Sequence, residues 1–482
     1  MQNIANKQRS YYLKVIIYLI LTFGIGYLPP FGAVTPMGMK VLGVFIGTVF
    51  GWMALGFIWP SLFAMAALGI IGYKGVNAVI MEGLGFNTLS AFILSFVLAA
   101  ALAKTNAPEL IANVMMKRKS FAGHPYLIMG LILLSMEVLS LLNGGYVALF
   151  MMWTLTITLA ESVGYKKGDG FMSFMIPAIL VIFIVSAQTF PFKEMAILYT
   201  GLFTKGTGLM VPYLPFTLWH LILQNIYILL LLFIARFILR LDVSKLEEKS
   251  GFFEKEKQVM TSDQKFGLII LLVFIVVMFI PSFLPNSWAM VKLLNRLGLP
   301  GVLIILLSIM AIRQTKQGES FVDLAKACSS GINWTVIWMV IATTPLATAL
   351  EDEACGVIST FTQFVVPIFS GLSPNVFIAV CAVVLGLATQ FLHNLVLNFI
   401  FIPLLCPICL QLGGNPYTCF LVCCFAMCTA IATPAASANA AFIFGHEYMS
   451  TKDAYTNGWM HAVLNLLLVI ILGIPLANLL FA

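Results

Sequence analysis

Two stretches of the sequence decide the fold: LLNGGYVALFMMWTLTITLA at Leu141–Ala160 and FLHNLVLNFIFIPLLCPICL at Phe391–Leu410. Each belongs to an apolar run, 125–162 or 358–412, that is long enough to enter a membrane twice, because one crossing needs roughly 20 residues. Polar or small residues interrupt each run, Asn143-Gly144-Gly145 in the first and His393-Asn394 in the second. Non-helical backbone is tolerated inside a membrane only where protein buries it or where it lines a cavity. The pattern therefore predicts two re-entrant hairpins with buried tips.

The composition excludes an ordinary soluble protein. Of the 482 residues, 61% are hydrophobic and only 9% are charged, whereas about a quarter of the residues in a soluble domain are charged. The net charge of +7 comes from Lys and Arg in short loops, without the basic helix or strand that a nucleic-acid partner would need. We expect an all-α polytopic membrane protein whose partner is the lipid bilayer.

The remaining apolar runs predict about 11 transmembrane helices in addition to the two hairpins. We expect helices near 11–30, 38–56, 58–73, 87–104, 170–200, 214–240, 264–286, 299–313, 333–350, 416–445 and 456–481. The segment 241–265 carries five Lys and six Asp or Glu and reads as a cytoplasmic linker. The chain would then divide into an N-terminal spanning helix (1–36), a first repeat (37–240), this linker and a second repeat (266–482).

The distribution of positive charge predicts the topology. Cytoplasmic loops are enriched in Lys and Arg, and two re-entrant hairpins place most of the 26 cationic residues on one side. If the first hairpin were a single span, Lys166 and Lys167 would lie opposite the cluster Lys117 to Lys119. The N-terminus is therefore expected in the cytoplasm and the C-terminus outside. This bias favours a cell (inner) membrane location.

The same order of interruptions in the apolar runs occurs in both halves of the chain. After each hairpin comes an apolar run broken at a Thr near a Pro, in Ala187-Gln188-Thr189-Phe190-Pro191 and in Ala430-Ile431-Ala432-Thr433-Pro434. Five spans per half give the halves opposite orientations, and inverted repeats with broken helices are typical of secondary transporters. Helix N-termini at such breaks suit anions, while unwound carbonyls suit cations. The sequence therefore indicates a transporter of small anions.

At these residues the chain resembles the divalent anion:sodium symporter family (solute carrier family 13-like), as a divergent member. That family carries Ser-Asn-Thr at both hairpin tips, and here the tips read Leu142-Asn143-Gly144 and His393-Asn394-Leu395. Pro403 follows the second tip at the family's spacing, whereas Met152 takes the corresponding place after the first. Ala432-Thr433-Pro434, with Asn439 and Gly445 after it, resembles a further family element.

The resemblance implies an elevator-type homodimer that moves di- or tricarboxylates or sulfate, with substrate between the tips and sodium as the coupling ion. It implies substrate contacts at Asn143, Gly144, Gly145, His393, Asn394, Leu395, Thr433, Pro434 and Asn439. Both tips keep Asn but lose Ser and Thr, and Phe192-Lys193-Glu194 stands where the family has Gly, Pro and Asn. Sodium coupling, proton coupling and exchange therefore stay open, and possible sodium ions are the only expected cofactors.

Several residues are candidates for the coupling ion or for a charge that replaces it: Leu142, Asn143, Thr189, Lys193, Glu137, Asn394 and Ala432. Lys193 lies within an apolar run, where a charge costs at least roughly 2.5–3.5 kcal/mol and therefore marks a functional candidate. Its ammonium could replace sodium or bind a substrate carboxylate, or it could pair with Glu194 or reach the surface. Glu137 could carry a proton, pair with Lys193 or simply be solvated.

The other polar candidates have competing structural interpretations. Asn143 and Asn394 could contact substrate or merely cap helix breaks, which Asn does well. His393 could bind an anion and change its charge near neutral pH, or bond to nearby backbone. His124, His220, His446 and His461 are expected at the membrane surface. The cysteines, including the CxxC pair Cys406 and Cys409, are expected to fill space in packed helices, with no metal bound.

Two other functional classes fit the sequence less well. A membrane enzyme would need a catalytic cluster, but His446-Glu447 lacks the second His of a zinc-protease motif and no nucleophile–base set is apparent. A channel would typically use rings of repeated groups, which two inverted halves with hairpins do not supply. We therefore expect a transporter and no enzymatic activity.

Overall fold

The computed structural model describes residues 2–86, 88–103, 123–142, 145–246, 260–315, 318–369, 371–434 and 436–482. The first part of the chain forms α1 (Gln2–Leu19), α2 (Pro36–Ala54), α3 (Ile58–Ile70), α4 (Val76–Leu84), α5 (Leu89–Ala103), α7 (Pro125–Leu141), α8 (Gly145–Ser162), α9 (Gly170–Ser186), α10 (Glu194–Thr207) and α11 (Tyr213–Phe233). The second part forms α12 (Ser262–Phe283), α13 (Ala289–Ile312), α14 (Leu324–Gly331), α15 (Trp334–Glu351), α16 (Val357–Phe369), α17 (Pro374–Ala388), α18 (Asn394–Gln411), α19 (Pro416–Cys428), α20 (Ala438–Phe444), α21 (Thr451–Leu468) and α22 (Ile474–Leu480).

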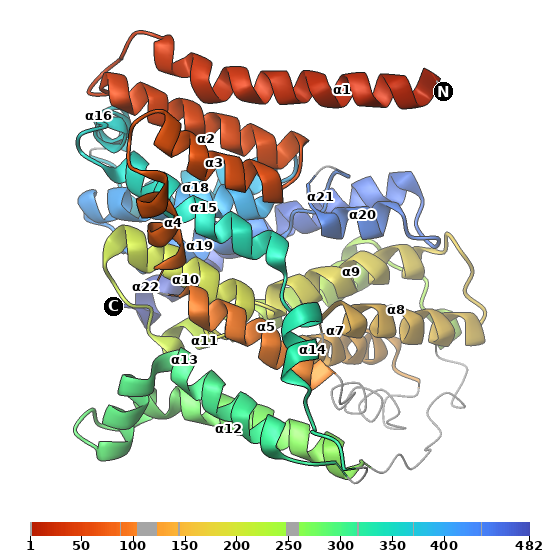
Figure 1. Cartoon of the computed structure of the whole chain (residues 1–482). Helices are drawn as coiled ribbons and strands as arrows, with labels where there is room; N and C mark the ends of the chain where they lie inside the picture. The colour runs from red at the N-terminus through yellow and green to blue at the C-terminus, as the bar shows by residue number, and fades with distance from the viewer. Residues whose placement is uncertain are drawn as a thin grey trace.

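The predicted fold class is confirmed. The described residues form helices and no named strand, and eight helices are long and apolar enough to cross a membrane, or up to ten if each bent pair counts as one span. The two termini lie at opposite ends of the molecule along the direction of its long helices (Figure 1). The number of spans and the re-entrant course of the hairpins stay predictions. Within the charged linker 241–265, residues 247–259 lie outside the described part of the chain.

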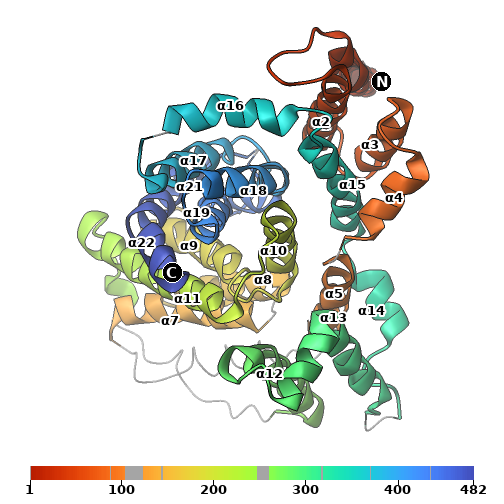
Figure 2. The same cartoon turned by 90° about the vertical axis from the view of Figure 1, so that its left-hand side faces the viewer.

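The helices form two bodies. The scaffold body contains α2–α5 and α12–α15, and the core body contains α7–α11 and α17–α22; Figure 2 shows the core body as a rounded bundle beside a column of scaffold helices. Helix α16 crosses from the scaffold to the core body. Within the scaffold, α15 packs on α3 and α4, while α5 packs on α13 and α14. Thus α15, from the second half of the chain, packs on scaffold helices of the first half, and α5, from the first half, packs on scaffold helices of the second.

Several sequence expectations require correction. Within the stretch 358–412, whose course as a hairpin stays a prediction, α16 is bent by 116° from α17. Gly371 makes this turn possible with a φ of +88°, a conformation that favours glycine. The expected span 299–313 is the second part of α13, which begins at Ala289 and kinks at Gly298, where φ is +59°. Helices α4 and α14 were not expected, since short helices with mixed polarity lack a membrane-length apolar run.

Both predicted helix breaks are present. Residues 187–193 separate α9 from α10, and residues 429–437 separate α19 from α20. The segments before the breaks are the most enclosed helices of the core body, with every described residue of α9 from Phe171 to Ser186 buried. A helix interrupted at such depth needs partners for its free backbone groups, and the side chains that supply them define the site.

Candidate functional site

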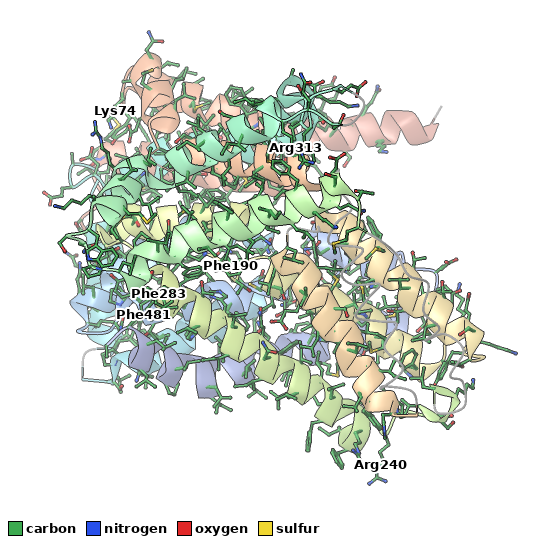
Figure 3. All side chains as sticks on the ribbon, turned by 90° about the horizontal axis from the view of Figure 1, so that it is seen from below. Lys74, Phe190, Arg240, Phe283, Arg313 and Phe481 are labelled. Carbon is green, nitrogen blue, oxygen red and sulfur yellow. The ribbon has the colours of Figure 1, made fainter. Side chains whose placement is uncertain are left out.

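The first break packs against the scaffold through aromatic rings. Phe190 stacks on Phe192 with ring centroids 5.2 Å apart, and Phe192 meets Phe274 of α12 at 5.0 Å. Figure 3 shows Phe190 beside α12, whose far end is marked by Phe283. The break therefore sits at the boundary between the two bodies, where a small gap of about 30 Å³ lies among Ser95, Phe190, Lys193 and their neighbours.

Lys193 is held at the end of the first hairpin arm. Its side chain is 9% exposed, and its ammonium donates a hydrogen bond to the carbonyl oxygen of Ser140, in the last turn of α7. A cation at this position is stabilised by the negative end of the helix dipole. The Ser140 hydroxyl donates to the carbonyl of Phe183 in α9 at 3.0 Å, which fixes the arm against the broken helix. No Lys193–Glu194 ion pair occurs within 4.0 Å among the described residues.

Glu137 is buried in the same arm, one turn before Ser140. Its Oε1 accepts hydrogen bonds from Gln224 Nε2 at 2.5 Å and Asn225 Nδ2 at 3.1 Å, both on α11. Its Oε2 is buried without a hydrogen-bond partner. Gln224 also accepts from the hydroxyl of Thr189 at 2.9 Å. Glu137 and Thr189 are thus joined through one amide, and Glu137 contacts amides rather than Lys193.

The second break is satisfied by neutral groups. Gln390, at the end of the second arm, accepts from the backbone N–H of Ala432 at 2.9 Å and donates to the carbonyl of Thr429 at 2.9 Å. The hydroxyl of Thr433 donates to the Gln390 carbonyl. Asn465 of α21 donates to the Phe425 carbonyl at 2.7 Å and to the Thr429 hydroxyl at 3.2 Å. Pro434 lies exposed beside this network.

The second tip begins α18. His393 is its N-cap, with Nδ1 accepting the N–H of Leu395 at 3.2 Å, and its ring packs on Phe57 of the scaffold at 5.2 Å. The Asn394 side chain also accepts from Leu395 N–H at 2.9 Å, and its carbonyl accepts from Asn398 at 2.8 Å. The capping roles considered for Asn394 and His393 are therefore present, and the tip contacts the scaffold.

One contact joins the two predicted substrate regions. Tyr146, which follows Gly145 at the start of α8, donates from its hydroxyl to Asn439 Oδ1 at 3.0 Å. The Tyr146 and Phe442 rings lie 5.6 Å apart. Helix α8 of the first hairpin thus contacts the broken helix of the second half, as α18 of the second hairpin packs on α10 of the first. At the first tip, Leu142 ends α7, while Asn143 and Gly144 lie outside the described residues.

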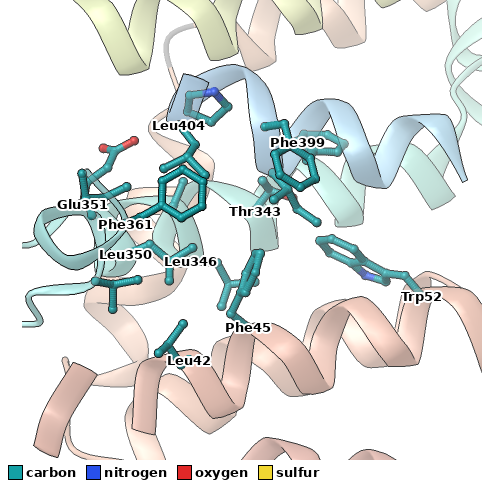
Figure 4. Close-up of a pocket in the computed structure, with 16 residues that line it drawn as sticks. Leu42, Phe45, Trp52, Thr343, Leu346, Leu350, Glu351, Phe361, Phe399 and Leu404 are labelled. Atoms are coloured by element: carbon teal, nitrogen blue, oxygen red, sulfur yellow. The ribbon is translucent and has the colours of Figure 1, made fainter. Parts of the chain in front are cut away.

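The boundary between the bodies is largely apolar near the second hairpin. A cavity of about 240 Å³ lies between α2, α15, α16 and α18, with Trp52 facing Phe399 and with Leu346 and Phe361 beside them (Figure 4). The Trp52 and Phe399 centroids are 6.4 Å apart. Apolar contacts are non-directional. Such a boundary therefore does little to fix the position of one body relative to the other.

Sequence reasoning missed the amides that organise both breaks, namely Gln224, Gln390 and Asn465. Each is a polar residue within an apolar run, the signal that singled out Lys193. The expectation that His220 and His461 lie at the membrane surface is wrong, since they are 3% and 0% exposed. His220 Nδ1 lies 2.9 Å from the Phe216 carbonyl, and His461 Nδ1 lies 2.6 Å from the Tyr227 hydroxyl. These partners make burial of the imidazoles possible.

Two broken helices and a largely apolar boundary between two helical bodies are typical of a polytopic membrane protein built like a secondary transporter. The chain belongs to the sodium:sulfate symporter family, whose transmembrane-region model matches residues 9–482. This confirms the resemblance, because that model describes the same group of symporters. The chain is therefore a secondary transporter of anions and a multi-pass membrane protein.

A solved structure shares the fold. The crystal structure of the YdaH transporter from Alcanivorax borkumensis, described as having an unusual topology, matches with a TM-score of 0.55 at 12% sequence identity. The match covers 83% of this chain and 86% of that chain. No curated protein sequence matches significantly. Both the family and the structural relative are transporters rather than enzymes.

Proposed function

We propose that this protein is an elevator-type transporter of small di- or tricarboxylates, coupled to sodium, in which Lys193 supplies one fixed positive charge. The observation that carries the proposal is the hydrogen bond from the buried ammonium of Lys193 to the Ser140 carbonyl. A carbonyl at the end of a membrane-inserted helix is a place where a cation is stabilised. Lys193 occupies this place with a charge that belongs to the chain.

The substrate class follows from the charges around the tips. Helices α8 and α18 both begin at predicted tips, at Gly145 and Asn394, so their N-termini carry partial positive charge. With the ammonium of Lys193, these two N-termini favour a ligand with two or more anionic groups. Di- and tricarboxylates meet this requirement, with groups spaced far enough apart to reach both halves. Sulfate concentrates its charge at one point and is the second choice.

Sodium is proposed for the second half. There the residues around Ala432 and Thr433 offer backbone carbonyls, an amide and a hydroxyl, and their hydrogen bonds to other described residues involve no charged side chain. Neutral oxygen ligands are what a hard cation prefers. The first half would need no sodium, because Lys193 is already there. We expect fewer sodium ions per cycle than two equivalent sites would bind.

The mechanism requires the core body to move against the scaffold. The apolar lining between α2 and α18 supports such sliding, since few directional bonds must break. We propose a homodimer held by the scaffold, a location in the cell membrane, and a cytoplasmic N-terminus with an external C-terminus. A moving core also accounts for the position of the first break at the boundary between the bodies.

Sodium-independent exchange is the alternative, favoured by the same lysine, and proton coupling through Glu137 is favoured by the buried, unpartnered Oε2. Uptake of succinate, citrate and sulfate into proteoliposomes, with sodium or choline outside, distinguishes these outcomes. We expect sodium-dependent dicarboxylate uptake in the wild type, its loss in Lys193→Met, and no change in Lys326→Met, an exposed lysine on α14.

The other outcomes have definite meanings. Uptake that needs internal substrate but no sodium identifies an exchanger. Uptake that follows a pH gradient and is abolished in Glu137→Gln identifies proton coupling. Transport and ion dependence that are unchanged in Lys193→Met would show that the lysine is structural, and the proposal would then be wrong.

A further inference from the structure

A second cavity lies between the two bodies, on the side where α10 faces the scaffold. It measures about 1130 Å³ and is lined by α10 on one side and by residues of α4, α5, α13 and α15 on the other. It extends from Pro191 at the first break to Lys205 near the end of α10. In Figure 2, α10 lies on the side of the core body that faces α5 and α15. The cavity therefore connects the candidate site with the far end of α10.

The wall formed by α10 is polar for a membrane helix. Ile197, Thr200, Gly201 and Thr204 line the cavity at spacings of three and four residues, so they share one face of the helix. Thr344 and Thr348 of α15 line it from the scaffold. The hydroxyls of Thr200, Thr344 and Thr348 donate to carbonyls of their own helices, so the charged donor on the cavity wall is Lys205.

Lys205 contributes a positive charge to this cavity. Its ammonium donates to the carbonyl of Thr344 and to the hydroxyl of Thr348 at 2.9 Å. An ammonium has three donors, and only these two bonds are found among the described residues, so one donor remains for a ligand. The two acceptors are neutral, and the charge of Lys205 is therefore not cancelled by a hydrogen-bonded carboxylate.

Two carboxylates lie near enough to influence this charge. Glu82 lines the cavity but forms an ion pair with Lys74 at 2.9 Å, which satisfies much of its charge. Glu351, at the end of α15, interacts electrostatically with Lys205, yet the described residues include no ion pair between them within 4.0 Å. Lys205 thus has a neutral immediate environment and acidic groups only in the surroundings.

We propose that this cavity is an anion vestibule and that Lys205 is a binding station for a small carboxylate or sulfate on its way to the tips. The identity of the anion rests on the proposed function. Lys205 bridges the core body and the scaffold, and an anion bound at its third donor competes with Thr344 and Thr348 for the ammonium, which weakens the contact between α10 and α15. Arrival of substrate and freedom of the core body to move are thereby linked.

Thiol labelling tests the station without any transport assay. Thr200→Cys is placed on a Cys328→Ser background, because Cys328 is the exposed cysteine among nine. The labelling rate is measured with an anionic and a cationic methanethiosulfonate. We expect the ratio of anionic to cationic rates to fall on the order of tenfold when Lys205 is changed to Met. Lys205→Arg, which keeps the charge, and Lys326→Met, far from the cavity wall, should preserve the ratio. An unchanged ratio in Lys205→Met overturns the proposal.

Protection by ligand and a transport readout complete the test. Citrate or sulfate should slow labelling of Thr200→Cys in the presence of Lys205 but not in Lys205→Met, and equal protection in both overturns the proposal. If the protein transports dicarboxylates, Lys205→Met should raise KM severalfold for uptake from the C-terminal face while kcat falls less. Anion-selective labelling in a protein that transports none of the tested anions would refute the proposed function and leave the vestibule standing.

Discussion

The two halves stabilise the same kind of break with different chemistry. In the first half, the ammonium of Lys193 donates a hydrogen bond to the Ser140 carbonyl at the end of α7. The carboxylate of Glu137 connects the same helix to α11. In the second half, the hydroxyl of Thr433 donates to the Gln390 carbonyl. The side-chain amide of Asn465, on α21, donates to the hydroxyl of Thr429 at the break. One half carries its own charges, whereas the other offers neutral oxygens. Under the proposed function, the two halves would bind different partners during one transport cycle.

The largest expected effect separates a charged contact from a neutral one. Lys193→Met removes a hydrogen bond with a charged donor, which is worth about 1.5–3 kcal/mol, and Thr433→Val removes a neutral one worth about 0.5–1.5 kcal/mol. If these energies act on transport, dicarboxylate uptake should fall about 10- to 150-fold in the first variant and about 10-fold or less in the second. Initial uptake rates in proteoliposomes measure both. Equal losses would remove the distinction between the halves.

A smaller effect is expected on stability. Glu137→Ala leaves the buried amide of Gln224 without its acceptor, which costs about 1–3 kcal/mol, whereas the exposed Asn225 keeps its hydrogen bond to the Leu221 carbonyl. Glu137→Gln keeps an acceptor oxygen and should lose less. Asn465→Ala removes the side-chain amide that donates to the Phe425 carbonyl. The stability of this variant should fall by the amount expected for one lost hydrogen bond. Thermal unfolding of purified protein measures these losses, with Glu137→Ala less stable than Glu137→Gln. Greater stability of Glu137→Ala than of Glu137→Gln would show that the buried carboxyl is strained rather than stabilising.

The third prediction tests the contact between the halves. Tyr146→Phe removes the hydroxyl that donates to Asn439 at 3.0 Å, a neutral bond, so transport should fall by about tenfold or less. Tyr417→Phe is the matched control, because its hydroxyl donates to the Met210 carbonyl at 3.1 Å, away from both breaks. We expect the control to transport normally. A larger loss in the control would mean that the Tyr146 contact has no special role.

The sequence predicted the parts of the site that depend on local pattern. Both breaks occur at the predicted Thr and Pro residues, because proline and small residues end helices wherever the chain folds. The partners of these breaks were not predicted, since Gln224 lies 35 residues from Thr189 and Asn465 lies 36 from Thr429. An isolated amide in an apolar run does not reveal which distant carbonyl it meets. Gln390 lies only three residues before His393, yet nothing in the local sequence pattern marks it as the partner of Thr429 and Ala432.

The smallest effect concerns the loops that precede α9 and α19, where the same contrast recurs. Asp169 accepts the backbone N–H of Lys166 at 2.9 Å and pairs with Lys245 at 3.1 Å, and these contacts lower the pKa of its carboxyl. Asn415, before α19, instead caps the helix with a neutral amide that accepts from Tyr417 N–H at 3.0 Å. Only the first loop should therefore respond to pH.

The sign follows from the lowered pKa of Asp169. Its stabilisation is fully present above the ordinary value of about 3.9 and is lost as pH falls through the lower folded-state value. We expect wild type to unfold at a slightly higher temperature than Asp169→Asn near pH 6, and the difference to close below about pH 4. Because the pair is at the surface, added salt should also shrink the difference. Asn415→Ala should lower the unfolding temperature by the same amount at both pH values, since a neutral cap does not titrate. A difference for Asp169→Asn that widened toward acid would mean that the carboxylate is repelled rather than held in this loop, and the contrast between charged and neutral halves would then stop at the breaks.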